Sequence, residues 1–289
     1  MNQVAFLLLY PILWGFSILP MRVLYGLSSA CYYLVYYVFG YRKAVVKQNL
    51  QRAFPNRSER DLKVIGHKFY RHLCDLIFES LKSLTISERE LKKRFTYINL
   101  EYFDGLKQTG KSGFIMCGHY ASWEWSFMMP SLVPFEGIGV YKRLKNPYFD
   151  RLVRKIRGRF EGILVANKEF RQYLNQQDAQ GIQTLSMIIS DQAPRSNTYK
   201  TKLPFLGVES PFFTGTEFIA RELDYALVYL KIEKIKRGYY QGTVVPLSDD
   251  PSALPELEVT RRFLHELEQQ IYTAPEFYLW SHKRWKHLD

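Results

Sequence analysis

The residues best suited to chemistry are a histidine and a carboxylate, His119 and Glu124, separated by four residues. They follow a short apolar run, Gly113 to Cys117, that is typical of a buried strand, and a helical run comes after them. Ligands of open α/β sheets bind where strands end, and a histidine beside a carboxylate can act as a general base. If Glu124 lies in the first turn of the helix, it can hold one imidazole nitrogen and leave the other free for a hydroxyl proton. We therefore expect His119 to be the base and Glu124 to orient it.

Other polar residues also come after apolar runs. Arg143, Lys168 and the segment Asp191–Arg195 each follow a run that is typical of a strand. Basic side chains gathered at strand ends can hold phosphate groups. We expect Arg143 and Lys168 to contact a phosphate or an oxyanion, and Asp191 and Arg195 to line the substrate site. A solvated basic surface explains any single one of these cations equally well.

One sequence matches a nucleotide-binding motif but stands in the wrong context. Gly105–Ser112 fits the phosphate-binding loop pattern G-x-x-x-x-G-K-[ST]. That motif works between a preceding strand and a following helix, whose terminal N–H groups meet the phosphate. Here a helical run precedes the motif and the strand-like run follows it. We therefore predict a polar turn that leads into a strand.

Charge is distributed unevenly along the 289 residues. The net charge is +12, yet residues 1–41 contain a single charged side chain, Arg22, which leaves +11 on the rest of the chain. A basic body behind an apolar N-terminus favours an anionic partner, which could be membrane phosphate, nucleic acid or an acidic carrier protein. An ordinary basic surface is the alternative.

The three cysteines, Cys31, Cys74 and Cys117, are too few and too widely spaced for a disulfide framework or a CxxC metal site. Cys117 is close to His119 in sequence, so a catalytic thiol must be considered. Its position inside an apolar run favours a buried packing role instead. We expect neither a metal ion nor a cofactor.

The N-terminus contains two uncharged runs, residues 4–19 and 23–41. Each approaches the roughly 20 residues that a helix needs to cross a membrane. No basic segment precedes the first run, which disfavours a secretory signal. Arg42, Lys43 and Lys47 follow the second run and indicate a cytoplasmic flank. We interpret residues 1–43 as a membrane anchor, either a single span or a re-entrant or interfacial helix pair, with a buried soluble helix as the alternative.

Periodicity predicts helices at 44–52 and 59–84, which make residues 44–95 a helical segment. From residue 96 to 289, short strands and helices alternate, as in an α/β catalytic domain with a mostly parallel sheet flanked by helices. The expected strands are Thr96–Leu100, Gly113–Cys117, Gly137–Tyr141, Gly162–Val165, Thr184–Ile189, Ala226–Ile232 and Tyr239–Val245. The expected helices are 101–108, 123–132, 147–157, 168–176, 215–223 and 257–273. A turn at Glu233–Gly238 predicts a hairpin, so the sheet should be mixed at one edge.

Taken together, these motifs carry a family resemblance. They occur in the order found in the lipid A biosynthesis acyltransferases, which add lauroyl and myristoyl chains in bacteria. The motifs are Gly118–Glu124, Tyr141–Pro147, Asp191–Arg195, Thr214–Thr216 and Ala274–Trp285. The His-x-x-x-x-Glu part alone resembles the wider lysophospholipid and glycerol-phosphate acyltransferases, and the Ala274–Trp285 ending is the more specific mark. The resemblance implies a glycerol-phosphate-acyltransferase-like fold with an N-terminal membrane helix.

The resemblance also implies a reaction and a location. The enzyme would lie in the bacterial inner membrane with its active site facing the cytoplasm. It would move an acyl chain from a thioester on acyl carrier protein to a hydroxyl of a lipid A precursor, with a coenzyme A thioester as the open alternative. His119 corresponds to the family's base, Glu124 to its acidic partner and Asp191 to the acid of a second motif. Only Lys168 supplies the cation expected before the mid-domain helix.

Alternatives remain at the level of sequence. Asp191–Arg195 differs in detail from the better-known members, so the acceptor could be another lysolipid or glycolipid. A protein of a different class, a non-enzymatic basic protein that binds membrane surfaces, would also carry this charge pattern. Nucleic-acid binding is disfavoured, because the apolar N-terminal run would serve no purpose there.

Overall fold

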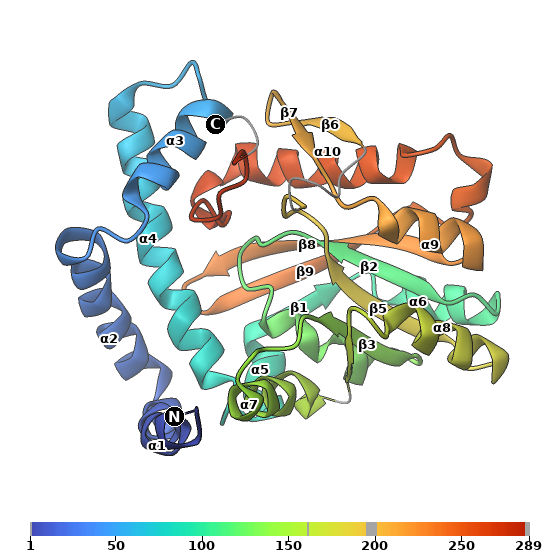
Figure 1. Cartoon of the computed structure of the whole chain (residues 1–289), viewed down its shortest axis with the longest axis horizontal. Helices are drawn as coiled ribbons and strands as arrows, with labels where there is room; N and C mark the ends of the chain where they lie inside the picture. The colour runs from blue at the N-terminus through green and yellow to red at the C-terminus, as the bar shows by residue number, and fades with distance from the viewer. Residues whose placement is uncertain (1, 161, 195–200, 287–289) are drawn as a thin grey trace.

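The computed structural model describes residues 2–160, 162–194 and 201–286 (Figure 1). Its N-terminal part is a helical layer built on the long helix α4, against which α1, α2 and α3 pack. The layer contains α1 (Asn2–Ile18), α2 (Met21–Tyr33), the π-helix η1 (Leu34–Val38), α3 (Lys43–Ala53), α4 (Glu59–Lys82) and α5 (Glu88–Arg94). Ser58 begins α4 by accepting a hydrogen bond from the backbone N–H of Asp61, as the capping pattern of the sequence indicates. Both predicted helices of residues 44–95 are present.

A seven-stranded sheet forms the core of the second part. Its strands are β1 (Phe95–Ile98), β2 (Gly113–Cys117), β3 (Glu136–Tyr141), β4 (Ile163–Ala166), β5 (Thr184–Ile189), β8 (Ala226–Lys236) and β9 (Tyr239–Ser248). Their order across the sheet is β1-β9-β8-β2-β5-β3-β4. All neighbours are parallel except β8 and β9, which form an antiparallel hairpin. The predicted mixed α/β sheet is therefore confirmed.

Helices cover both faces of this sheet (Figure 1). They are α6 (Glu101–Gln108), η2 (Trp125–Leu132), α7 (Pro147–Arg157), η3 (Gly158–Phe160), α8 (Phe170–Ala179), α9 (Gly215–Leu223), η4 (Pro251–Ala253), α10 (Glu258–Thr273) and η5 (Pro275–Phe277). The segment predicted as a helix at 123–132 forms the 3₁₀ helix η2, which contains Pro130. Proline lacks the N–H that an α-helical interior needs, so a short 3₁₀ helix suits this sequence better.

A separate hairpin of β6 (Lys202–Phe205) and β7 (Val208–Pro211) lies beside α10 and was not expected from the sequence (Figure 1). Its turn is made by Leu206 and Gly207, which have φ angles of 53° and 74°. Hairpin turns of this kind favour Asn or Gly at both positions. Because a leucine occupies the first of them, the usual signal is missing.

The segment Gly105–Ser112, which matches a nucleotide-binding motif, is a turn. Helix α6 ends at Gln108, Gly110 adopts a φ of 80°, and β2 begins at Gly113. The Lys111 ammonium pairs with Asp224 at 2.6 Å. Because no helix follows the glycines, the motif has no helix N-terminus on which to hold a phosphate.

The apolar N-terminal segments form short helices. Among the described residues no single helix has both the length and the hydropathy of a membrane span. The pair Met21–Val38 and Lys43–Ala53, bent by 91° relative to each other, meets the criteria only jointly, by length and composition. Several large apolar side chains of this region are exposed, among them Leu8 at 67%, Val38 at 67% and Phe39 at 75%.

Candidate active site

Two side chains from neighbouring strands meet at the carboxyl edge of the sheet. β2 and β5 are adjacent and parallel, and the N–H of Ser190 binds the carbonyl of Cys117 where the strands end. His119 follows β2, and Asp191 follows β5. The Nδ1 atom of His119 lies 2.6 Å from Oδ1 of Asp191. The topology therefore builds a histidine–carboxylate pair from residues that are 72 positions apart.

The other ring nitrogen of His119 lies 3.1 Å from Nε2 of Gln192. An amide N–H donates, so Nε2 of the imidazole accepts from Gln192, and Nδ1 carries the proton that it donates to Asp191. This tautomer places a lone pair on Nε2. The His119 side chain keeps 17% exposure, whereas the Asp191 side chain keeps 2%. His119 can therefore take a proton on the accessible side while the buried carboxylate holds its other side.

Electrostatics keep the buried carboxylate charged. Burial alone would raise the pKa of Asp191, but the imidazole and the hydrogen bonds of His119, together with the Arg284 guanidinium, hold that pKa below its ordinary value. Burial lowers the pKa of His282, a neighbour of this pair, to about 4. His282 is therefore neutral near pH 7, and Asp191 is ionised beside the Nδ1 atom of His119.

The C-terminal segment Ala274–Trp285 holds the loop that carries His119. The His119 carbonyl accepts from the N–H of Leu279 at 3.1 Å, and the Ala121 N–H donates to the Phe277 carbonyl at 3.0 Å. The Tyr120 hydroxyl donates to the Ala274 carbonyl at 2.8 Å. These bonds fix both sides of the histidine. They give a structural role to the segment that marks the family resemblance.

Residues of the N-terminal helical layer form hydrogen bonds to this C-terminal segment. The Asn49 amide donates to the carbonyls of Trp280 and His282 at 2.8 and 2.7 Å. Arg42 donates to the carbonyl of Ser281 at 2.9 Å. The helical layer therefore reaches the catalytic loop through the chain's C-terminal residues.

Two backbone positions in the loop are unusual. A Cβ on Gly118 would lie 2.7 Å from a methyl group of the buried Leu267 in α10, so a larger residue would force that side chain to shift. Ala121 adopts a φ of 49°, in the left-handed region that costs a non-glycine residue energy. The left-handed residue Ala121 turns the chain between His119 and Glu124.

Glu124 is not the partner of His119, and the expected contact between them is wrong. Its carboxylate pairs with Arg157 of α7, with N···O distances of 2.5 and 3.0 Å. The left-handed turn at Ala121 separates the two residues, and Glu124 then stands at the N-cap of η2, facing α7. Both members of this ion pair are largely buried, at 24% and 22% exposure. A catalytic role of Glu124 stays a prediction.

The structure describes two of the three remaining residues that were predicted to bind substrate, Arg143 and Lys168, and does not describe Arg195. Arg143 and Lys168 follow β3 and β4, so they lie at the same edge of the sheet as His119. Arg143 donates to both carboxylate oxygens of Glu169, at 2.7 and 2.9 Å, in an exposed pair. Lys168 is exposed on the turn after β4. Arg195 lies outside the described residues, and contacts of all three with substrate stay predictions.

A pocket of about 610 Å³ opens beside the histidine–carboxylate pair. It is lined by Val35, Phe39, Tyr41, Arg42, Leu73, Ile77, Gln192, Leu279, Ser281 and His282. Gln192, which binds Nε2 of His119, joins apolar side chains from η1 and α4 in this wall. An amphipathic substrate could thus place a chain on the apolar wall and a hydroxyl near Nε2. Within the described ranges, no three His, Cys, Asp or Glu side chains cluster as metal ligands.

Comparison with known proteins decides the class. A model described as bacterial lipid A biosynthesis acyltransferase matches residues 2–287. The chain belongs to this family. It is 27% identical over 287 residues to the lipid A biosynthesis lauroyltransferase of Escherichia coli K12, an alignment that covers 95% of this chain and 89% of that protein. Two lipid A biosynthesis acyltransferases of Haemophilus influenzae are 24% identical (85% and 78% covered) and 25% identical (80% and 72% covered).

The protein is therefore an acyltransferase, and a non-enzymatic binding protein is no longer the alternative. Its Cys117 is not placed to act as a nucleophile. The side chain is 1% exposed, and burial raises the pKa of its thiol. A buried thiol with a raised pKa carries little of the reactive thiolate. The packing role expected from the sequence fits these properties.

One residue that sequence analysis missed, Glu79, forms hydrogen bonds with residues that follow His119 in this acyltransferase. Glu79 of α4 is 1% exposed and accepts hydrogen bonds from the hydroxyls of Tyr25, Tyr240 and Ser122. Its backbone carbonyl accepts from the indole N–H of Trp125 at 3.1 Å. A single glutamate within a strongly periodic helix gives no signal of such a role. The burial of a carboxylate among three hydroxyl groups is visible only in the fold.

Removal of the Glu79 side chain should destabilise the acyltransferase. In Glu79→Ala the three hydroxyls lose their acceptor, at about 1–3 kcal/mol for each buried group left unpaired. Acyl transfer should fall with it, because Ser122 lies in the loop that carries His119 and Trp125 begins the helix η2 that follows this loop. Thermal unfolding and initial rates check both effects, with Glu79→Gln as the shape-matched control. An alanine variant as stable as the parent would contradict this role.

The same carboxylate should also affect how stability depends on pH. Burial raises the pKa of Glu79 above its ordinary 4.5 in the folded state. An acid with a raised folded pKa makes the native state less stable as pH rises from 4.5 to that pKa. Glu79→Gln should therefore flatten this part of the stability curve, as measured by denaturant unfolding at several pH values.

The Glu124–Arg157 ion pair should behave as one unit in acyl transfer. Glu124→Gln and Arg157→Gln should each lower kcat by a similar factor, and the double variant should be no worse than either. The reason is that each replacement leaves the other charge in a largely buried place without its partner. The kcat values of the parent, the two single variants and the double variant complete this double-mutant cycle. Fully additive losses would show that Glu124 works independently of Arg157.

Proposed function

We propose that this acyltransferase moves a fatty acyl chain from a thioester on acyl carrier protein to a hydroxyl of a lipid A precursor. The observation that carries the proposal is the hydrogen bond between His119 and Asp191. It leaves Nε2 of His119 against Gln192, which lines the amphipathic pocket. The names of the relatives, one of them a lauroyltransferase of lipid A biosynthesis, support the choice of acceptor and acyl chain.

In the proposed reaction, the acceptor hydroxyl replaces Gln192 as the partner of Nε2 on His119. Nε2 takes the hydroxyl proton as the oxygen attacks the thioester carbonyl, and the Asp191 carboxylate stabilises the imidazolium that forms. Collapse of the tetrahedral intermediate expels the thiolate of the donor, which takes the proton from His119. The chain transfers directly, without an acyl-enzyme.

The oxyanion of that intermediate needs a hydrogen-bond donor. Such a donor typically contributes about 3–4 kcal/mol to transition-state stabilisation. Arg143 and Lys168, at the ends of β3 and β4, are the cations that we assign to the oxyanion or to the phosphates of the acceptor. Arg143 would have to leave Glu169 to do so, and that exposed pair is weak enough to exchange.

Two features support a carrier protein as the donor. Acyl carrier proteins are acidic, and the chain has a net charge of +12. Three cations of α7, Arg151, Arg154 and Lys155, line a hollow of about 530 Å³, and none of them is ion-paired within the described part of the chain. A cationic surface of this kind attracts an acidic partner and speeds its association.

The proposal also places the enzyme on the cytoplasmic side of the bacterial inner membrane, held by residues 1–41. Leu8 and Ile12 of α1 are 67% and 55% exposed and share one helix face. Burial of such a side chain in the membrane contributes about 1.5–3 kcal/mol. Leu8→Asp with Ile12→Asp should therefore shift the protein from the membrane pellet to the supernatant. Ile235→Asp, a change at an exposed position of β8, should leave it in the pellet.

A donor and acceptor panel tests the reaction. Purified enzyme would be assayed with lauroyl and myristoyl thioesters of carrier protein and of coenzyme A, each against an acylated glucosamine disaccharide phosphate, a lysophospholipid and a glycolipid. The proposal expects the carrier thioester and the disaccharide lipid to give the highest kcat/KM. Preference for a lysophospholipid would assign the enzyme to the alternative reaction.

A further inference from the structure

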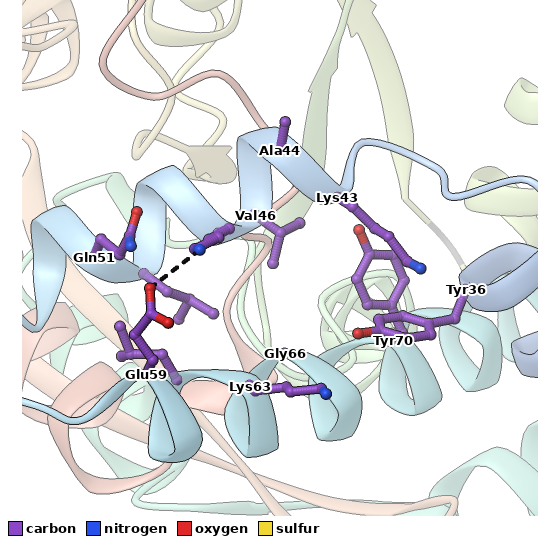
Figure 2. A pocket seen from close by; sticks show the side chains of 12 residues that line it. Tyr36, Lys43, Ala44, Val46, Gln51, Glu59, Lys63, Gly66 and Tyr70 are labelled. Carbon is purple, nitrogen blue, oxygen red and sulfur yellow. Dashed lines mark ion pairs between the residues drawn. The ribbon is translucent and has the colours of Figure 1, made fainter.

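A second pocket, of about 340 Å³, lies between α3 and α4 (Figure 2). Tyr36 and Lys43 stand at one end of it, and Gln51 and Glu59 stand at the other (Figure 2). Its floor is apolar and consists of Val46, Leu50, Leu62 and Gly66. None of its lining residues belongs to the histidine–carboxylate pair or to the pocket beside it.

Three lysines border this apolar floor: Lys43 and Lys47 from α3, and Lys63 from α4. Lys47 pairs with Glu59 at 3.1 Å. The Lys43 ammonium lies 3.9 Å from the centre of the Tyr36 ring. Across the part of the chain that the structure describes, neither Lys43 nor Lys63 is ion-paired with a carboxylate. Two cations therefore face the pocket without an anion.

A neighbouring histidine, His67, lies close to the same cations. The rings of His67 and Tyr36 lie 4.4 Å apart. Burial lowers the pKa of His67, and the charges of Lys63, Arg71 and Lys43 lower it further. Lys43 and Lys63 of the pocket lining therefore add to one positive region together with Arg71, and such a region attracts an anion.

We propose that this pocket binds one anionic membrane lipid. Its phosphate would lie between Lys43 and Lys63, and the first part of an acyl chain would lie on Leu50, Leu62 and Gly66. A free phosphate would use the lysines but leave the apolar floor exposed to water, which favours a lipid. Exposed Val38 and Phe39, just before α3, place the pocket next to an apolar surface from which such a lipid could enter.

The position of the site gives it a consequence for the rest of the molecule. The segment from η1 to the start of α3 lines two pockets. Val35, Phe39 and Arg42 face the pocket by His119, whereas Tyr36 and Lys43 face this one. A lipid bound here would fix the bend that forms part of the catalytic pocket wall. Occupancy can nevertheless be measured without the reaction, because neither His119 nor Asp191 lines this pocket.

Equilibrium binding of a fluorescent phosphatidylglycerol to the full chain in detergent micelles tests the proposal. Each lysine next to an anionic headgroup contributes about a fivefold gain in affinity. Lys43→Gln with Lys63→Gln should therefore weaken binding by about 25-fold. Lys92→Gln with Lys93→Gln, on α5, removes equal charge from another surface and should leave the affinity unchanged. Thermal unfolding confirms that each variant is folded.

A second variant tests the apolar floor. A Cβ on Gly66 would lie 3.9 Å from a Leu50 methyl group, so a larger side chain at this helical position fits and occupies the floor. Gly66→Leu should weaken phosphatidylglycerol binding at least as much as the lysine pair does. If this variant does not fold, the lysine pair decides alone.

Competition separates lipid from phosphate. Unlabelled short-chain phosphatidylglycerol should displace the probe, whereas phosphatidylcholine and inorganic phosphate should not at equal concentration. The proposal fails if the Lys43/Lys63 variant binds like the parent, if a folded Gly66→Leu variant binds like the parent, or if inorganic phosphate competes as well as the lipid.

Discussion

Replacing His119 by alanine should lower kcat of acyl transfer by about 10²- to 10⁴-fold, the usual contribution of a positioned general base. The loss follows from the geometry, because Nε2 of His119 contacts Gln192, which lines the pocket. The substrate-binding walls do not depend on the imidazole, so KM should change much less than kcat. Initial rates with a carrier-protein thioester and a lipid acceptor measure both constants.

The control for this change is His265→Ala, which removes an exposed histidine from α10 and should keep full activity. Near-parental acyl transfer by the His119 variant in membranes would exclude His119 as the base. A loss that appears in KM alone would also count against the mechanism, since it would give the histidine a binding role instead.

Asp191→Asn should produce a loss of similar size, about 10²- to 10⁴-fold in kcat. Asparagine has nearly the same shape, but it carries no charge to stabilise the imidazolium, and its amide can hold the ring in the wrong tautomer. Initial rates of the parent and the variant with a carrier-protein thioester and a lipid acceptor measure this loss.

Stability offers a second readout for the same residue. The folded pKa of Asp191 lies below its ordinary value, so the carboxylate stabilises the fold above that ordinary value. This contribution is lost as pH falls through the folded pKa. Asp191→Asn should remove it at all pH values, whereas Asp104→Asn on the exposed face of α6 should not. An Asp191 variant with parental kcat would exclude Asp191 as the carboxylate that supports His119 in the reaction.

The sequence predicted much of the sheet because its central strands are continuous apolar runs with polar or glycine-containing ends. β2 and β5 begin and end at the predicted residues. The turn Glu233–Gly238 correctly predicted the hairpin of β8 and β9, although both strands extend beyond their predicted ends. Apolar runs mark which segments are buried, and they contain no information about where a partly polar strand stops.

The partner of His119 could not be predicted by the same means. The local pattern offered Glu124, five positions along the chain, as the nearest carboxylate. Which strand lies beside β2 is a property of the topology, and the sequence does not state it. Once β5 is known to be that strand, the rule that residues at parallel strand ends meet at one edge places Asp191 against His119. The sequence had assigned Asp191 only to the substrate site.

The hydrogen bonds from Asn49 and Arg42 to the C-terminal segment determine when the His119 loop can be held in place during translation. Residues 277–279 bind the backbone of the His119 loop, and the N-terminal helices bind residues 280–282. A nascent chain that has reached β9 already contains the base, the carboxylate and the helical layer, but it lacks the piece that joins them. The hydrogen bonds that hold the His119 loop against the helical layer can therefore form only after translation has passed His282.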